Sequence, residues 1–217
     1  LPAAFHAPVP EERVAQARVA SAILGETMVK RFPWAGRTRP MVDEKVEVVL
    51  NRTWRPALSI TGADGLPPIA NAGNVLRPVT KLKLSLRIPP TLDGEQATAE
   101  LKALLEADPP HGATVRFEPD QGATGWNAPA TAAWLAEAID ASSRTFFGQP
   151  SGALGEGGTI PFMGMLGKQF PEAQFLITGV LGPKSNAHGP NEFLHVPYAK
   201  RLTACVAQVI VAHAQRV

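Results

Sequence analysis

A polar loop that follows an apolar segment carries the side chains best suited to chemistry. Within Gly182-Pro-Lys-Ser-Asn-Ala-His-Gly-Pro-Asn-Glu192, an imidazole and a carboxylate lie four positions apart, at His188 and Glu192. Open α/β sheets place ligands at such loops, beyond the carboxyl ends of their strands. An imidazole is a common metal ligand, and a nearby carboxylate can orient it. The loop therefore predicts a metal ligand at His188. A loop histidine that binds backbone or solvent is the alternative.

The metal hypothesis requires ligands that this sequence does not supply. A catalytic zinc takes about three protein ligands, but the other histidines have no ligand partners at a useful spacing. These are His6, His111, His195 and His213. Either the loop has no chemical role or the partners of His188 lie outside this chain.

Two further stretches could bind an anion. In Glu156-Gly157-Gly158-Thr159, consecutive glycines would let backbone N–H groups approach a ligand, and Thr159 adds a hydroxyl. An ordinary turn before a helix explains this motif equally well. Arg87 ends an alternating strand, where its guanidinium could hold a carboxylate through two hydrogen bonds. A solvated cation beside Lys81 and Lys83 is the favoured alternative for Arg87.

Composition excludes several classes of protein. The 217 residues are 45% hydrophobic and 18% charged, with a formal net charge of +2, which is typical of a folded globular protein. Lysine and arginine form no stripe, so we expect no nucleic-acid partner. No apolar run approaches the roughly 20 residues that span a bilayer. The single Cys205 excludes an internal disulfide. No signal peptide is visible, and among the compartments left open the cytoplasm is favoured.

The first part of the chain is expected to fold as helix, strand, strand, helix and strand. Turn residues and hydrophobic spacing place these elements at 8–25, 45–60, 80–88, 93–105 and 114–118. Leu82, Leu84, Leu86 and Ile88 alternate with polar residues, which indicates a strand with one buried face. One more strand before the first helix would complete a βαββαβ sandwich. That strand is not in the sequence.

The second part combines helices with a single strand. Helices are expected at about 127–147, capped by Asn127, and at 197–213, and the apolar segment 174–181 reads as a strand buried on both faces. Such a strand needs neighbours on both edges and helices on both faces. Residues 125–217 provide no neighbouring strand. We therefore expect an α+β chain divided into domains at 1–124 and 125–217, and we expect it to be the C-terminal part of a larger protein.

Three motifs together resemble one family of enzymes. The motifs are Glu156-Gly-Gly-Thr-Ile-Pro161, the His188 loop with Pro197-Tyr198, and the stretch from Leu50-Asn-Arg-Thr-Trp-Arg-Pro56 through Ser85-Leu-Arg-Ile-Pro89. They are similar to the C-terminal half of the zinc-dependent exopeptidases and deacylases. That family includes aminoacylases, carnosine-type dipeptidases, glutamate carboxypeptidases, acetylornithine deacetylase and succinyl-diaminopimelate desuccinylase.

The resemblance implies a fold and a role for each matching residue. It implies that 1–124 is an incomplete lid, or dimerisation, domain with ferredoxin-like βαββαβ order. It implies that 125–217 is the end of an α/β catalytic domain that holds two zinc ions. His188 matches a zinc ligand, and Asn191 and Glu192 support its loop. Gly158 and Thr159 match the substrate loop, and Arg87 matches an arginine that binds the substrate's terminal carboxylate.

The family's remaining machinery is absent from this sequence. Its His-x-Asp motif, bridging aspartate, Glu-Glu pair and last acidic ligand would precede Leu1. The resemblance thus implies a whole protein that is a homodimer through the lid and that hydrolyses a small peptide or an N-acyl amino acid. It implies no catalytic residue in this chain, which alone would be inactive. The alternative is a dimerisation or binding module with a vestigial metal loop.

Overall fold

The computed structural model describes residues 1–120, 122–156 and 161–216. Two compact units make up this part of the chain. The first comprises residues 1–127 and 154–165, and the second comprises residues 128–153 and 166–217. Helix α6 (Pro161–Gln169) contributes to both. The predicted domain boundary at 124/125 stays a prediction.

Helix α1 (Glu11–Leu24) opens the first unit and confirms the helix expected at 8–25. Glu11 and Glu12 lie in its first turn, where the positive end of the helix dipole favours them. Gly25 ends the helix at φ 51°, and its backbone N–H donates to the Ser21 carbonyl. A short helix, α2 (Thr27–Lys30), follows.

Residues 45–53 form helix α3 (Lys45–Thr53), so the strand expected over 45–60 was wrong in its first half. Val46, Val49, Leu50 and Trp54 recur at helical spacing and turn one face towards α1. The Glu44 carboxylate accepts hydrogen bonds from the backbone N–H groups of Val46 and Glu47, which caps the helix. This packing and capping outweigh the strand preference of the valines.

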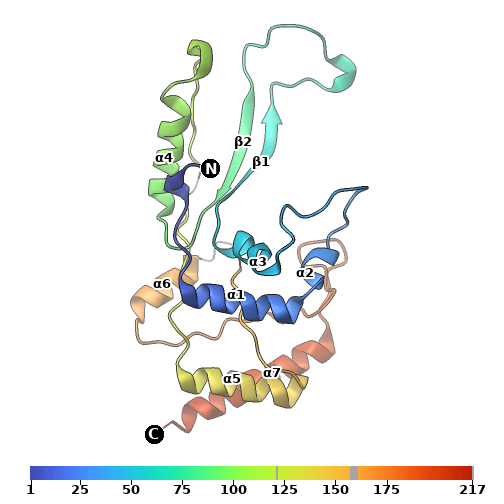
Figure 1. The fold of residues 1–217 in the computed structure, drawn as a ribbon, viewed down its shortest axis with the longest axis vertical. Coiled ribbons are helices and arrows are strands. Elements are labelled where there is room, and N and C mark those ends of the chain that lie inside the picture. Colours follow the sequence, from blue (N-terminus) through green and yellow to red (C-terminus); the bar gives the residue numbers. More distant parts are fainter. Residues whose placement is uncertain (121, 157–160, 217) are drawn as a thin grey trace. The chain divides into compact units, whose positions relative to one another are not determined.

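Helices α1 and α3 pack against each other (Figure 1). The larger of two apolar clusters in the first unit joins them. Its buried members are Ala17, Val49, Leu50 and Trp54, and around them pack Val9, Val14, Met28, Val46 and Leu154. Leu154 comes from far along the chain and lies two positions before the glycine-rich motif that begins at Glu156.

Strands β1 (Ala57–Asp64) and β2 (Lys81–Arg87) form a two-stranded antiparallel sheet. Leu58 pairs with Leu86 and Ile60 with Leu84, which gives the hairpin one apolar face, as the alternation in 80–88 predicted. The register shifts between Ile60 and Gly62, so Thr61 forms a bulge. Among the described residues no third strand joins this sheet.

Helix α4 (Gly94–Glu106) covers part of that face and confirms the helix predicted at 93–105. The Asp93 carboxylate accepts a hydrogen bond from the backbone N–H of Gln96 at 2.9 Å and caps the helix. A second cluster joins α4 to β2 and to a short 3-10 helix at Ala3–Phe5. It consists of Phe5, Ala97 and Leu101, with Leu86, Ile88, Leu105 and Phe117 around them.

The strand predicted at 114–118 is not formed, because this segment pairs with no strand in the described chain. It is held by side chains instead. Phe117 packs into the second cluster, and its backbone N–H donates to the Glu106 carboxylate at 2.7 Å. The first unit is therefore helices with one antiparallel hairpin. Two short 3-10 helices complete its elements, at Ile69–Asn71 and Pro110–Gly112.

In the second unit, helices α5 (Ala133–Phe147) and α7 (Val196–Ala214) pack side by side (Figure 1). Their contact buries Leu135, Ser142, Cys205 and Val209. The final helix matches the one expected at 197–213. Helix α5 begins later than predicted, and Asn127 does not cap it. Asn127 accepts hydrogen bonds from Arg13, and the Gln174 side chain accepts the Ala132 N–H at 2.6 Å.

The apolar segment 174–181, expected as a doubly buried strand, is not assigned as a strand. Leu176, Ile177 and Val180 are 39%, 55% and 51% exposed. A strand needs a hydrogen-bonding neighbour, and the described part of this chain offers none. No helix among the described residues is both long and apolar enough to cross a membrane.

Candidate functional site

The loop that carries His188 holds an unusual backbone conformation. Four of its non-glycine residues have positive φ angles between 56° and 62°, namely Lys184, Asn186, His188 and Asn191. A non-glycine residue in the left-handed region costs on the order of 1 kcal/mol or more. Strain of this kind persists only where surrounding contacts impose the conformation.

The base of the loop is closed by Ser185 and Gly182. Ser185 is 3% exposed, and its hydroxyl lies 2.7 Å from the Leu181 carbonyl and 2.9 Å from that of Gly182. A Cβ on Gly182 would lie 2.8 Å from the His195 Cβ, and the residue has φ 84°. Only glycine meets both conditions. The His195 N–H also donates to the Leu181 carbonyl at 2.8 Å, which joins the two ends of the loop.

The tip of the loop is tied by Asn186 and Glu192. The Asn186 side-chain amide donates to the Pro190 carbonyl at 2.7 Å, and the Gly189 N–H donates to the Asn186 carbonyl at 2.9 Å. The Glu192 carboxylate accepts the backbone N–H of His188 at 3.0 Å. Glu192 therefore holds the main chain of His188, whereas the sequence had suggested contact with its imidazole.

The imidazole of His188 is exposed, and within the described residues no hydrogen bond occupies it. Asn191 is also exposed. The backbone around His188 is fixed while its ring nitrogens are available. That arrangement suits an imidazole that donates a nitrogen lone pair to a metal ion.

These residues fit one position of a zinc site and do not complete it. The described residues contain no cluster of three or more His, Cys, Asp or Glu that could hold a metal ion. An exposed imidazole on a fixed loop is the appropriate donor for zinc. Its co-ligands would have to come from outside the described residues.

Arg87 is the last residue of β2 and lies in the first unit. Its strand partner is Ala57, and Ser59 pairs with Ser85 two residues away on the same polar face. Ile88 and Pro89 follow directly, and both are anchored: Ile88 packs in the second cluster and Pro89 is fully buried. The backbone of Arg87 is thus held, its side chain is exposed, and its partner across the hairpin is the small residue Ala57. An exposed guanidinium can bind a carboxylate through two hydrogen bonds.

Of the predicted substrate loop, the structure describes only the beginning. Gly158 and Thr159 lie outside the described residues. Glu156 is described, and its carboxylate accepts hydrogen bonds from the Arg52 guanidinium of α3. These two residues are 104 positions apart, and no spacing rule links them. Their contact therefore had no signal in the sequence.

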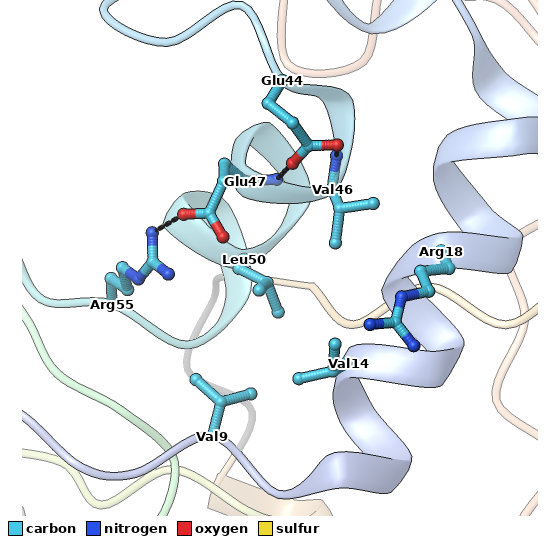
Figure 2. Close-up of a pocket in the computed structure, with 8 residues that line it drawn as sticks. All are labelled: Val9, Val14, Arg18, Glu44, Val46, Glu47, Leu50 and Arg55. Atoms are coloured by element: carbon cyan, nitrogen blue, oxygen red, sulfur yellow. Dashed lines mark hydrogen bonds and ion pairs between the residues drawn. The ribbon is translucent and has the colours of Figure 1, made fainter.

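A separate open pocket of about 390 Å³ lies between α1 and α3 (Figure 2). It is lined by Val9, Val14, Arg18, Glu44, Val46, Glu47, Leu50 and Arg55. Its carboxylates are engaged, because Glu44 caps α3 and Glu47 forms an ion pair with Arg55, which holds the pKa of Glu47 below its ordinary value. None of the residues predicted to bind metal or substrate lines this pocket.

Comparison with known proteins finds similarity to peptidases. The chain is 29% identical over 172 residues to a cysteinylglycine-S-conjugate dipeptidase of Corynebacterium striatum, and the match covers 73% of this chain and 35% of that protein. No protein-family model matches the chain.

Three solved structures of peptidases have a similar fold. They include an M20-family metallo-carboxypeptidase of Sulfolobus solfataricus (TM-score 0.71, 17% identity) and the dipeptidase Dug1p of Saccharomyces cerevisiae (0.73, 19%). Human carnosine dipeptidase 1 is a third (0.70, 18%). The matches cover 96%, 98% and 100% of this chain but only 46%, 44% and 47% of those chains. The predicted resemblance to the zinc-dependent exopeptidases is confirmed, and the chain spans less than half the length of these relatives.

Proposed function

We propose that the whole protein containing this chain is a zinc-dependent dipeptidase or deacylase. It would hydrolyse a peptide or N-acyl amide bond in a small substrate that bears a free carboxylate. The observation that carries the proposal is the exposed imidazole of His188 on a loop whose backbone is fixed by its own hydrogen bonds. The sequence similarity to a dipeptidase supports it.

Each predicted site residue of this chain has a distinct role in the proposed reaction. His188 donates a ring nitrogen to one of two zinc ions, and Glu192 with Asn191 maintains the loop that presents it. When bound, the zinc ions supply Lewis acidity and an activated water. Gly158 and Thr159 contact the reacting part of the substrate, and Arg87 binds its free carboxylate. The general base and the other ligands belong to other parts of the whole protein, so this chain alone is inactive.

The proposed domain roles follow the same division. Residues 1–124 form the lid, whose βαββαβ sandwich is completed in the whole protein and mediates a homodimer. Residues 125–217 form the end of the catalytic domain, in which the segment 174–181 joins a larger parallel sheet. The exposure of Leu176, Ile177 and Val180 supports this role, since it leaves an apolar segment without the strand neighbours it needs.

A non-catalytic dimerisation module is the second candidate. The hairpin favours it, because Leu58, Ile60 and Leu82 are 44%, 63% and 52% exposed on its apolar face. The two candidate functions predict different sequence motifs in the parts of the whole protein outside this chain. A catalytic protein requires a His-x-Asp motif and a Glu-Glu pair there, and a module requires neither.

The test is the His188→Ala substitution in the whole protein. We expect zinc content to fall and dipeptide hydrolysis to drop by at least about a thousandfold, because a catalytic zinc that loses a ligand is displaced or misplaced. Unchanged zinc content and turnover would overturn the assignment. Absence of zinc and of hydrolysis in the unmutated protein would favour the module.

A further inference from the structure

We infer that Ser185 is a positioning residue for His188, and that its buried hydroxyl is required for tight zinc binding. The inference rests on the proposed function, because that function makes His188 a zinc ligand. The Ser185 hydroxyl donates to main-chain carbonyls at the base of the loop. It therefore acts on the ligand through the backbone, and it contacts neither the metal nor the substrate.

Ser185 is the one buried residue of this loop. It is 3% exposed, whereas every other residue from Gly182 to His195, a range that the structure describes in full, is exposed or half-buried. A loop with no buried apolar side chain has no hydrophobic cluster to hold its shape. Buried hydroxyls are almost always hydrogen-bonded. The hydrogen bonds of Ser185 therefore take the place of a core in this loop.

The Ser185 hydroxyl draws the chain back onto the residues at which the loop starts. Its oxygen lies 2.7 Å from the Leu181 carbonyl oxygen and 2.9 Å from that of Gly182. The Leu181 carbonyl also accepts the backbone N–H of His195, at 2.8 Å. His195 is the cap of α7. The hydroxyl and the first residue of that helix thus share one acceptor, which ties the loop to a long element of regular structure.

The main chain of Ser185 carries this restraint towards His188. The Ser185 carbonyl accepts the backbone N–H of Phe193 at 3.1 Å. Phe193 directly follows Glu192, whose carboxylate accepts the backbone N–H of His188 at 3.0 Å. A hydroxyl, a carbonyl and a carboxylate therefore connect the base of the loop, step by step, with the backbone of the proposed zinc ligand.

The backbone on both sides of Ser185 needs such a restraint. Lys184 and Asn186 have φ angles of 62° and 56°, and His188 follows with a φ of 61°. Non-glycine residues keep these conformations only where surrounding contacts impose them. If the Ser185 bonds are lost, these residues can relax to more favourable backbone angles, and the His188 ring moves with them. Zinc binding is sensitive to such a movement, since a zinc–nitrogen bond is confined to about 2.0–2.1 Å.

The experiment measures zinc affinity of Ser185→Ala in the whole protein by competition titration with a zinc chelator. Affinity should fall about tenfold, a loss typical of groups that support metal ligands. Hydrogen exchange of the Phe193 amide should accelerate, because its acceptor is the Ser185 carbonyl. A second variant, Ser185→Ala/Glu192→Ala, should lose less affinity than the product of the two single losses, because both residues act on one backbone. A loss equal to that product would contradict the proposed connection.

The matched control is Ser142→Ala. Ser142 lies on α5 in the same unit, is 1% exposed, and its hydroxyl donates to the carbonyl three residues earlier, that of Ile139, at 3.0 Å. Ser185 makes the same kind of bond to Gly182. Each substitution removes one buried hydroxyl, so urea denaturation should show similar losses of stability. Zinc affinity should fall only in Ser185→Ala.

The outcomes separate this inference from the proposed function. If the whole protein binds zinc and hydrolyses dipeptides, but Ser185→Ala retains the affinity of the unmutated protein, the positioning role is refuted while the function stands. Equal losses of affinity in Ser185→Ala and Ser142→Ala would also refute it, because they would reflect general destabilisation. If the unmutated protein binds no zinc, the proposed function fails, and this inference with it.

Discussion

The backbone N–H of His188 donates a 3.0 Å hydrogen bond to the Glu192 carboxylate, so the acid of this loop holds the main chain of the histidine. Because His188 has a φ of 61°, this bond helps to maintain a conformation that is unfavourable for its residue type. Glu192 can therefore influence the proposed metal ligand, His188, without touching its ring.

The first prediction concerns this bond. Glu192→Ala in the whole protein should weaken zinc binding about tenfold, because residues that support ligands typically contribute 10- to 100-fold to metal affinity. Glu192→Gln keeps an acceptor oxygen and should change affinity less than about threefold. Competition titration with a zinc chelator measures both. Equal losses in the two variants would show that the carboxylate acts through its charge.

The second prediction separates two histidines of the same region. His195 Nδ1 accepts the backbone N–H of Tyr198 at 3.1 Å and thereby caps α7. His195→Ala should lower the free energy of unfolding by about 1 kcal/mol, and His195→Asn should restore most of it, since asparagine is a good cap. Urea denaturation of the whole protein gives both values. Zinc affinity should change in neither variant, in contrast to His188→Ala.

Local signals predicted those elements whose stabilising interactions lie close together in the sequence. The cap of α4 by Asp93, the end of α1 at Gly25 and the alternation of β2 all depend on neighbours within a few residues. Helix α3 was mistaken for a strand because its valines favour strands. The helical spacing of Val46, Val49 and Leu50 was present in the sequence, but its packing against Ala17 of α1 was not.

The same distinction between near and distant contacts holds for the residues of the candidate site. His188 and Glu192 are four residues apart, so their association could be predicted, although its form could not: the acid binds the backbone. The contact of Arg52 with Glu156 spans 104 positions and depends on how α3 folds. No pattern of residue types can reveal such a contact before the fold is known.

The third prediction concerns the carboxylate of the substrate. Arg87→Ala in the whole protein should lower kcat/KM for dipeptides about 10- to 100-fold, since a hydrogen bond to a charged group contributes about 1.5–3 kcal/mol. Carboxyl-amidated dipeptides should lose little, because the arginine has no charged partner in them. Arg87→Lys should recover only part of the activity, since lysine cannot form the two parallel bonds. Equal losses on free and amidated substrates would refute the role.

The fourth prediction is a pH dependence of the segment 114–118. The ion pair with Lys102, together with the Phe117 N–H bond, lowers the pKa of Glu106 below its ordinary value of 4.5. A carboxyl group whose pKa is lower in the folded state stabilises the fold at a pH above its pKa in the unfolded chain. This stabilisation is lost as the pH falls through the pKa of the folded state. Protection of the Phe117 amide from hydrogen exchange, corrected for intrinsic rates, should therefore decline below about pH 4.5. In Glu106→Gln, which does not titrate, this decline should be absent.

The fifth prediction tests whether the segment 174–181 is buried in the whole protein. Ile177 is 55% exposed in the structure of this chain, and a polar substitution at an exposed site usually changes stability by less than about 0.5 kcal/mol. If the segment joins a sheet, Ile177→Lys should instead destabilise the whole protein by more than about 3 kcal/mol, because it buries an unpaired charge.

The control must be a substitution at a site that is exposed and unstrained. Lys184→Ile, a change in the neighbouring exposed loop, is unsuitable because of the positive φ of Lys184. Thr203→Lys on the exposed face of α7 is suitable. Comparable thermal unfolding of the Ile177 and Thr203 variants would place 174–181 on the surface of the whole protein and remove the support that this segment gives to the larger sheet.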